Sequence, residues 1–228
     1  MLRKVAFGLI WISFITYAFI FAPPNQPDTF ELIKNMSTGE FAGINPLIIA
    51  VFYLMGIWPM MYGCMLFLDG RGQKIPAWPF VTGSFFLGAF SLVPYLALRQ
   101  NNPNFEGKKN WFLQLQDSKW LSWLLTLAAI GLIFYGLLKG DWADFAQQWQ
   151  TSRFIHVMSL DFCLLSLLFP TLIGDDLARR GVENPLLYRA VSLVPLLGGL
   201  IYLCLRPPLI VDGEQLQTTQ QQLPVTNQ

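Results

Sequence analysis

The sequence contains six apolar stretches, each close to the length that a helix needs to cross a lipid bilayer. A bilayer core about 30 Å thick takes roughly 20 residues in a helix that rises 1.5 Å per residue. Proline, glycine or charged residues bound each stretch, as is typical where a helix enters water. The stretches predict an all-α fold, a polytopic membrane helical bundle of about six transmembrane helices, over residues 5–22, 46–68, 76–98, 120–138, 154–174 and 190–205.

The composition excludes several other classes of protein. Only 13% of the residues are charged, whereas a soluble domain carries about 25%. A net charge of +1 gives no electrostatic basis for binding nucleic acid. Three cysteines without C-x-x-C spacing fit neither a disulfide framework nor a thiolate-bound metal. We therefore expect a membrane protein without a metal centre. No motif indicates a reaction that it catalyses or a ligand that it binds.

The chain divides into a helical domain and a tail. Residues 1–206 hold the apolar stretches, whereas residues 207–228 are polar and lack apolar periodicity, which predicts a disordered tail. The basic pair Arg3-Lys4 before an apolar run also resembles a signal peptide. That run is long for a signal peptide, and Ala22-Pro23-Pro24 is a poor cleavage site. We expect the first helix to be retained.

Tryptophan residues gather at the ends of the predicted spans. Indole rings favour the interface between membrane and water, where they anchor helices. We interpret this set as such an aromatic belt: Trp78, Trp111, Trp120, Trp123, Trp142 and Trp149.

The positive-inside rule does not orient the six predicted spans. Seven basic residues fall on the side of the N-terminus and eight on the opposite side, so neither side has the excess that marks the cytoplasm. Keeping Arg3 and Lys4 untranslocated favours both termini inside.

The two halves of the chain share a faint pattern. If it is a duplication, each unit has three helices, and the second copy is inverted because three is odd. Some transporters are built from such inverted repeats; chance alignment of helices rich in Leu, Phe and Pro is the alternative. The matching pairs are Asp28 and Asp141, Pro59 and Pro170, Pro76 and Pro185, and Arg99 and Arg206, with offsets that fall from 113 to 107.

Asp161 is the candidate that the sequence singles out most clearly. It lies about two turns inside the fifth stretch, where a carboxylate costs about 2.5–3.5 kcal/mol to insert. No basic residue lies three or four positions away on the same helix. We expect a hydroxyl, a backbone amide or a residue of another span to be its partner, unless burial keeps it protonated. Either a structural hydrogen bond or a ligand or proton site fits this pattern.

His156 and Arg153 are the other ligand or partner candidates, and both lie at the start of the same stretch. A single histidine excludes a bis-histidine haem within the chain. It can act as one axial ligand to a pigment magnesium or bond to a polar head group, or it can simply occupy a helix end at the interface. Asp161 lies five residues further, about 140° around the helix, so the two side chains do not form a pair.

Two charged motifs predict solvated loops. Asp175-Asp176 with Arg179-Arg180 resembles the acidic pairs of membrane transferases that bind magnesium diphosphate, but the second acidic cluster of those sites is missing. Asp69-Gly70-Arg71-Gly72 lacks the spacing of a phosphatidyltransferase signature.

Three runs of the chain resemble a family of cyanobacterial and plastid multi-span membrane proteins. They are residues 45–52, 69–80 and 152–161, and the resemblance covers most of residues 28–206. It implies a photosynthetic host and a thylakoid membrane, and the family has no established activity. The helices that contain Asp161 and end at Arg99 are also similar to small uncharacterised membrane domains, whose distant relatives include plant proteins required for neoxanthin formation; this likeness assigns no residue a role.

Three functions follow as expectations. The first is a non-catalytic accessory or assembly protein of the thylakoid membrane, in contact with lipid and with photosystem subunits. The second is a small-solute or proton-coupled carrier, and the third is a protein that binds or modifies a carotenoid or another isoprenoid. No cofactor is predicted, although a single chlorophyll or carotenoid fits such a bundle.

Overall fold

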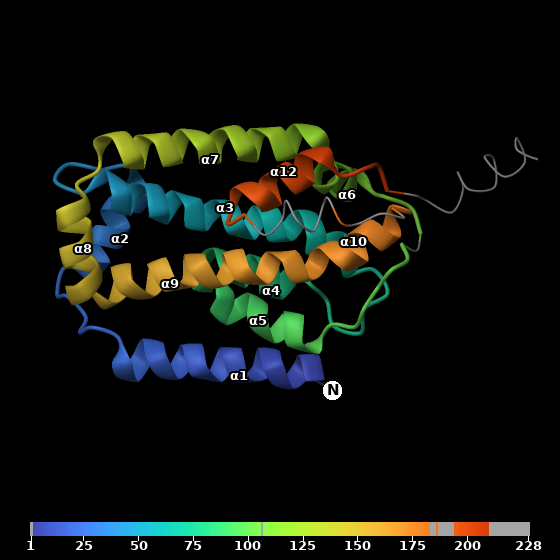
Figure 1. Ribbon diagram of the computed structural model, residues 1–228, viewed down its shortest axis with the longest axis horizontal. Helices are drawn as coiled ribbons and strands as arrows, with labels where there is room; N and C mark the ends of the chain where they lie inside the picture. The colour runs from blue at the N-terminus through green and yellow to red at the C-terminus, as the bar shows by residue number, and fades with distance from the viewer. Residues whose placement is uncertain (1, 106, 183–185, 187–193, 210–228) are drawn as a thin grey trace, which may run out of the picture.

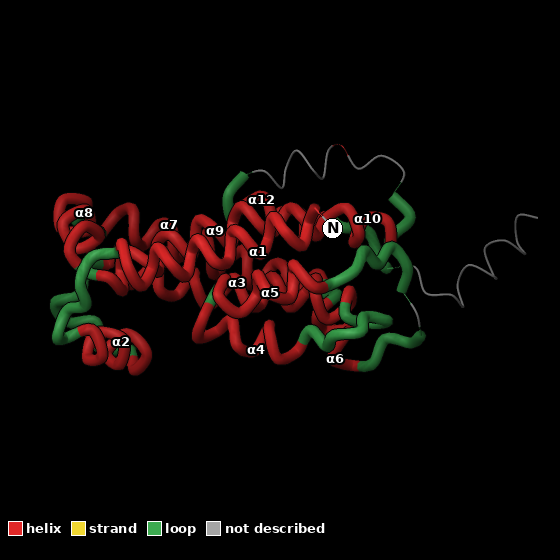
Figure 2. The backbone as a smooth tube through the Cα atoms, turned by 90° about the horizontal axis from the view of Figure 1, so that it is seen from below, coloured by secondary structure: helices red, strands yellow, loops and turns green. Residues whose placement is uncertain are grey.

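The computed structural model describes residues 2–105, 107–182, 186 and 194–209, and in these residues all regular structure is helical. The helices form an elongated bundle in which the long ones lie side by side (Figure 1). Most of the loops gather at the two ends of the bundle (Figure 2). The all-α fold class predicted from the sequence is therefore confirmed for the described residues.

Four helices of the described chain are long and apolar enough to cross a membrane. They agree with the first, second, fourth and fifth predicted spans. The first is α1, Leu2–Thr16, which continues as a π-helix over Tyr17–Phe21. The others are α3, Pro46–Asp69; α7, Lys119–Lys139; and α9, Arg153–Leu168, which continues through a 3-10 turn over Phe169–Leu172 into α10, Ile173–Arg179.

Local capping explains where two of these helices begin. The Asn45 side chain accepts a hydrogen bond from the amide of Leu47, and Pro46 takes the first helical position of α3, where a missing N–H is harmless. The Ser118 side chain caps α7 in the same way, by accepting from the amide of Leu121. Both caps stand directly before an apolar run, so the helix starts coincide with the entry into the apolar layer.

The third predicted span, residues 76–98, is not one helix. It consists of α4, Trp78–Leu87, and α5, Ala89–Leu98, which meet at Gly88. Gly88 has φ +51° and ψ −129°, a conformation that favours glycine. The Ser91 hydroxyl donates to the Phe80 carbonyl at 2.8 Å, and the rings of Phe80 and Tyr95 are 5.4 Å apart. These contacts show that α5 folds back along α4 as a hairpin.

The length of this hairpin corresponds to half a bilayer. Ten residues at 1.5 Å each reach about 15 Å, half of a core about 30 Å thick. The hairpin therefore enters and leaves at the same end of the bundle. The expectation of a third span is wrong here because apolar length alone cannot distinguish a crossing helix from two half-helices.

Short helices close both ends of the bundle. The helices α2, Thr29–Thr38, and α8, Trp142–Thr151, lie at one end, and α6, Trp111–Gln116, lies at the other (Figure 1). The last described helix is α12, Leu197–Leu205. It covers the second half of the sixth predicted span, whose residues 190–193 lie outside the described chain, as do residues 210–228 of the predicted tail.

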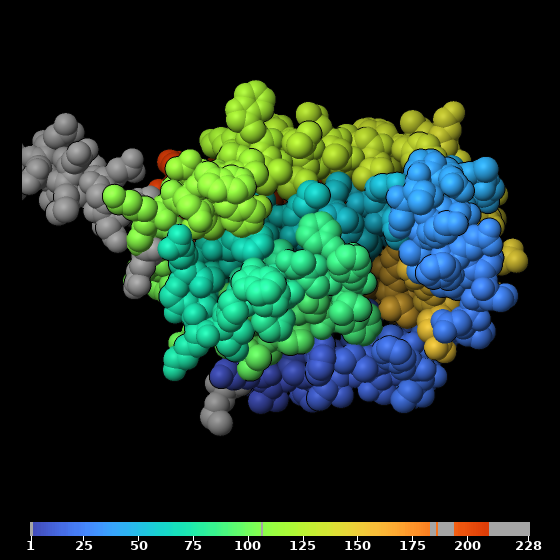
Figure 3. Space-filling view, turned by 180° about the vertical axis from the view of Figure 1, so that it is seen from behind, coloured from blue at the N-terminus to red at the C-terminus, as the bar shows by residue number. Residues whose placement is uncertain are grey.

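The core is built around α3. Trp58, Tyr62, Met61 and Met65 on this helix are fully buried. By contrast, α1 and α7 lie along opposite edges of the molecule (Figure 3) and leave many large apolar side chains uncovered. Helices that are apolar on all faces but buried on only one are expected where lipid surrounds the fold.

The directions of the helices bear on the predicted repeat. α1 and α7 both run from the end that holds α6 towards α8, and α3 and α9 both run back (Figure 1). An inverted second copy would instead reverse α7 relative to α1. The structure therefore does not confirm an inverted repeat, because the described long helices of the two halves run in the same order of directions and residues 76–98 of the first half do not add a third crossing.

A proline inside α5 explains one contact of α1. Pro94 has no N–H, so the Phe90 carbonyl one turn earlier loses its helical partner. The Trp11 indole of α1 donates to that carbonyl at 2.9 Å. The ring of Phe14 also stacks on Phe90, with the centroids 4.5 Å apart. The first helix is thereby bonded to the hairpin.

Candidate functional site

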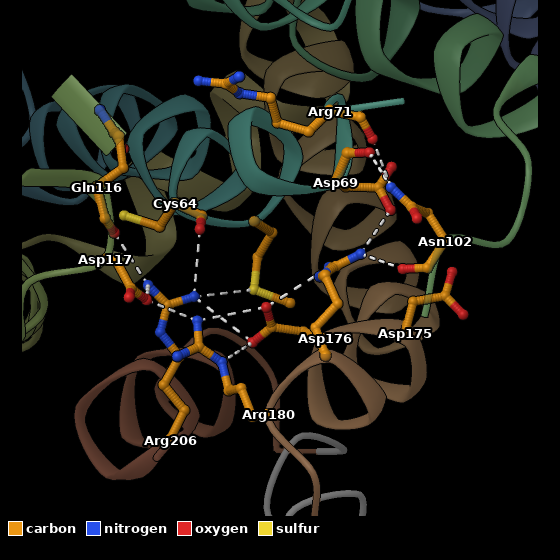
Figure 4. Close-up of polar contacts among 12 residues, drawn as sticks. Cys64, Asp69, Arg71, Asn102, Gln116, Asp117, Asp175, Asp176, Arg180 and Arg206 are labelled. Atoms are coloured by element: carbon orange, nitrogen blue, oxygen red, sulfur yellow. Dashed lines mark hydrogen bonds and ion pairs between the residues drawn. The ribbon is translucent and has the colours of Figure 1, made fainter. Parts of the chain in front are cut away.

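A cluster of arginines and aspartates lies inside the end of the bundle that holds α6 (Figure 4). We call it the ion-pair network. Four helix ends and the segment after α6 contribute to it, and every member except Asp175 has a side chain no more than 6% exposed. Its members are Asp69, Arg99, Asp117, Asp175, Asp176, Arg179, Arg180 and Arg206.

The first part of the network joins the two halves of the chain. Asp69 ends α3, and its carboxylate accepts from Arg99 Nε at 2.8 Å and from Arg179 Nη1 at 3.0 Å. Arg99 also bonds to Asp175. Because Arg179 and Asp175 belong to α10, these bonds fasten the end of the hairpin to the second half of the chain.

The second part of the network is centred on Asp176. Its carboxylate accepts from Arg180 Nε at 2.9 Å and from the Tyr202 hydroxyl at 2.6 Å, and Arg206 Nη1 lies 3.6 Å away. Asp117 accepts from Arg180 Nη2 at 2.7 Å. The ends of α6, α10 and α12 therefore meet at one set of charges.

The network corrects the expectation of two solvated loops. Asp69, Asp176 and Arg179 are fully or almost fully buried rather than solvated. Sequence reasoning missed them because most of their partners are about 30 to 110 positions away along the chain. One signal was present: Asp69 and Arg99 recur 107 positions later as Asp176 and Arg206, and each pair lies together.

Burial and charge act in opposite directions on the arginines of the network. Burial alone would lower the pKa of Arg99, but the hydrogen bonds and the charge of Asp69, followed by those of Asp175, raise it above its ordinary value. Burial likewise opposes the charged form of Arg180, whose pKa Asp176 and Asp117 hold above the usual range. Both guanidinium groups therefore stay charged inside the protein.

Asp161 lies on α9 against the tip of the hairpin. Its Oδ1 accepts a hydrogen bond from the amide of Ala89, the first residue of α5, at 2.8 Å. A Cβ added to Gly88 would lie 1.7 Å from its Oδ2, so the carboxylate fills the space that glycine leaves open. A backbone amide is one of the partners that the sequence left open. No described basic residue pairs with this side chain.

His156 bonds at both ring nitrogens. The Tyr17 hydroxyl lies 2.9 Å from Nε2, and the Trp149 carbonyl lies 2.8 Å from Nδ1. The Trp149 ring also packs on the imidazole, with the centroids 4.2 Å apart. Ligation of a pigment magnesium would require one of these hydrogen bonds to break.

Arg153 holds the segment after the first helix. Its Nε donates to the Pro23 carbonyl at 2.9 Å, and its amide donates to the Pro24 carbonyl at 3.1 Å. Arg153 and His156 together attach this segment to the start of α9. Asp161 bonds elsewhere, to α5, so the structure brings the first two candidates together and leaves the third apart.

A polar cleft lies at the end of the bundle opposite the network. It has a volume of about 440 Å³ and lies between α2, α8 and the start of α3. No pattern in the sequence predicts this cleft. Three carboxylates and three amide side chains line most of it: Asp28, Glu31, Asn35, Asn45, Asp144 and Gln148. Within the described residues, no group of three or more His, Cys, Asp or Glu side chains is arranged to hold a metal ion.

Comparison of the chain with protein-family models, with curated proteins and with solved structures gives no match. The resemblance to a cyanobacterial and plastid family therefore stays a prediction.

Proposed function

We propose that this chain is an integral membrane carrier that moves a proton, alone or together with a small solute, through a site around Asp161. The observation that carries the proposal is the hydrogen bond from the Ala89 amide, at the start of a half-length helix, to this carboxylate. Asp161 is the ninth residue of α9, about 12 Å from the start of that helix. The hairpin tip lies about 15 Å from the start of α4. Both lengths indicate the middle of a bilayer.

Interrupted helices support this proposal. In many transporters the substrate and ion sites lie at the bilayer midplane, where half-helices begin, and matching breaks in the two halves point to the site. Here α5 begins after Gly88 and α12 begins after Leu196, 108 positions later, and these residues have φ values of +51° and +56°. Together with the shared direction of α1 and α7 (Figure 1), these corresponding helix starts favour a parallel repeat, a second arrangement that transporters use.

The two ends of the bundle differ in a way that suits alternating access. At one end, Asp69 pairs with Arg179 and Asp175 pairs with Arg99, so ion pairs join the two halves of the chain. At the other end, the polar cleft lies between α2 of the first half and α8 of the second. Its carboxylates, among them Asp28 and Glu31, would raise the local concentration of protons and cations.

A proton on Asp161 would change the contact at the hairpin tip. The carboxylate faces the N-terminus of α5, where the helix dipole favours negative charge. Protonation removes that charge and weakens the bond to the Ala89 amide. The tip is then held less firmly against α9, which couples the charge of Asp161 to the position of the hairpin.

Proton flux into vesicles tests the proposal. Purified protein is reconstituted into vesicles that contain a pH-sensitive dye, and a pH gradient is imposed in plain buffer and again with a mixture of amino acids, sugars and organic acids outside. We expect the proton flux into vesicles with wild-type protein to be higher than the flux into protein-free vesicles under at least one condition. The Asp161→Asn variant should lose at least nine-tenths of this additional flux.

Glu40→Gln provides the matched control, because Glu40 is an exposed carboxylate outside the polar cleft. This variant should keep the wild-type flux. Flux of wild-type protein that equals protein-free vesicles under both conditions, or an Asp161→Asn variant that transports normally, contradicts the proposal.

A second candidate function, binding of an oxygenated carotenoid or other isoprenoid, has its own supporting observation. The Trp58 indole N–H and the Ser166 hydroxyl are buried without a hydrogen-bond partner in the described chain. The Trp58 ring lies 6.0 Å from those of Phe162 and Phe169. A hydroxyl or keto group on an apolar ligand could take up these donors.

Binding of zeaxanthin to the purified protein tests this second candidate. We expect the absorbance of the pigment to shift on binding, and Trp58→Phe to weaken the affinity about fivefold through the lost hydrogen bond. The exposed Trp123 gives the control, Trp123→Phe, which should bind normally. Absence of any shift, or equal affinity of all three proteins, contradicts this function.

The accessory role expected from the resemblance stays a prediction. The exposed apolar faces of α1 and α7 (Figure 3) fit a protein partner as well as they fit lipid. Affinity purification from a photosynthetic membrane tests it: co-purifying photosystem subunits would support the role, and recovery of the chain alone would contradict it.

A further inference from the structure

The basic residues are concentrated at one end of the bundle. Because the hairpin returns to the end where it starts, the loops before and after it lie on the same side as the N-terminus (Figure 1). Eleven of the fourteen basic residues in the described chain fall at this end, and three, Lys34, Lys139 and Arg153, fall at the other. We call the first the basic end; it holds Arg3, Lys4, Arg71, Lys74, Arg99, Lys108, Lys109, Lys119, Arg179, Arg180 and Arg206.

Six of these eleven side chains have no carboxylate partner among the described residues: Arg3, Lys4, Arg71, Lys74, Lys108 and Lys119. The other five pair with carboxylates of the ion-pair network. Arg3 donates to the Arg99 carbonyl and to Asn101, and Arg71 donates to the Lys108 carbonyl, so these two are positioned without being neutralised. The carboxylates described at this end are already engaged with the buried arginines.

Tryptophans show the depth at which these cations lie. Trp78, Trp111 and Trp120 are exposed at the basic end, each at or beside the first residue of a helix. Exposed indole rings lie at the level of the lipid headgroups. A lysine precedes each of them by one to four positions, namely Lys74, Lys108 and Lys119. Their ammonium groups can therefore reach the headgroup layer.

We propose that the six unpaired cations of the basic end bind the headgroups of anionic lipids, and that this end faces the cytoplasmic leaflet. Charge complementarity carries the inference, since anionic lipids concentrate in that leaflet and attract basic side chains beside a span. The same distribution satisfies the positive-inside rule, which the six-span arrangement left undecided. The opposite end carries five described carboxylates against three basic residues and repels such lipids: Asp28, Glu31, Glu40, Asp141 and Asp144.

Lipid retention tests this interaction. Full-length protein is purified from vesicles made of equal parts phosphatidylglycerol and phosphatidylcholine, and the lipids that remain bound are quantified by mass spectrometry. We expect the wild-type protein to retain phosphatidylglycerol over phosphatidylcholine by about threefold or more. The triple variant Lys74→Gln/Lys108→Gln/Lys119→Gln, which removes three of the six cations, should lose at least half of this enrichment.

The control removes cations from the opposite end. Lys34→Gln/Lys139→Gln should keep the wild-type enrichment, and thermal unfolding of every variant establishes that it is folded. The proposal is overturned if the triple variant keeps its enrichment, if the control loses it to the same extent, or if inorganic phosphate in the buffer lowers it as far as the triple substitution does. The last result would identify a site for free phosphate rather than for lipid.

Discussion

At the scale of single residues, the contact between Gly88 and Asp161 shows how closely the hairpin tip is fitted. The glycine supplies both a backbone conformation that other residues rarely adopt and the space that the carboxylate occupies. The burial of Asp161 could be predicted from the sequence, because an apolar stretch surrounds it. Its partner could not, because the Ala89 amide is 72 positions away and every residue has a backbone amide.

Gly88→Ala should therefore destabilise the protein. The added Cβ would lie 1.7 Å from Asp161 Oδ2, and the residue would keep a φ of +51°. Backbone strain and the forced displacement of the carboxylate should together cost about 2 kcal/mol or more. Thermal unfolding in detergent measures the effect. Gly131→Ala on α7 is the control, since nothing lies within 4 Å of its added methyl group; equal melting temperatures for the two variants would contradict this account.

Asp69 offers a second prediction at the residue scale. Asp69→Asn keeps the shape of the side chain but leaves Arg99 and Arg179, both buried, with one carboxylate fewer. Loss of one partner of a buried ion pair typically costs about 3–5 kcal/mol. Thermal unfolding should show a large loss for this variant and almost none for Glu40→Gln, whose side chain is exposed. A small loss for Asp69→Asn would mean that the network contributes little to stability.

At the scale of helices, hydropathy predicts four elements well and one wrongly. The helices α1, α3, α7 and α9 agree with predicted spans because a crossing helix needs little more than apolar length. Residues 76–98 have the same length and apolarity, yet they fold back at Gly88. The signal that separates the two outcomes is a single backbone conformation, which the sequence shows only as one glycine among the 18 of the chain.

The bond between α1 and the hairpin gives a prediction at this scale. Trp11→Phe removes the donor to the Phe90 carbonyl that Pro94 leaves unpaired, and it should cost about 1 kcal/mol. In a Pro94→Ala background, the Phe90 carbonyl regains a helical partner, so Trp11→Phe should lower the free energy of unfolding by less. The difference, measured by thermal unfolding of all four proteins, is the interaction energy. Equal costs in the two backgrounds would show that Trp11 contributes packing alone.

At the scale of the whole molecule, the orientation proposed for the chain depends on the position of the hairpin. If residues 76–98 crossed the membrane, the loops on either side would face opposite compartments, and the basic residues would be shared almost equally. Since the hairpin does not cross, eleven of fourteen described basic residues lie on one side. The ion-pair network depends on the same geometry, because it needs the ends of α3, α5, α10 and α12 at one end of the bundle (Figure 1).

The hairpin places residues 74 and 108 on the same side of the membrane, whereas six crossing spans place them on opposite sides. We expect Lys74→Cys and Lys108→Cys, each made after the native cysteines are replaced by serine, to react with a membrane-impermeant maleimide only once the cytoplasmic face is opened. Lys139→Cys, at the far end of α7 (Figure 1), should react in intact cells. Six crossing spans would instead expose residue 108 on the side opposite to residue 74. Labelling of residues 74 and 108 from different sides would therefore rule out the hairpin and, with it, the shared end on which the ion-pair network and the basic end depend.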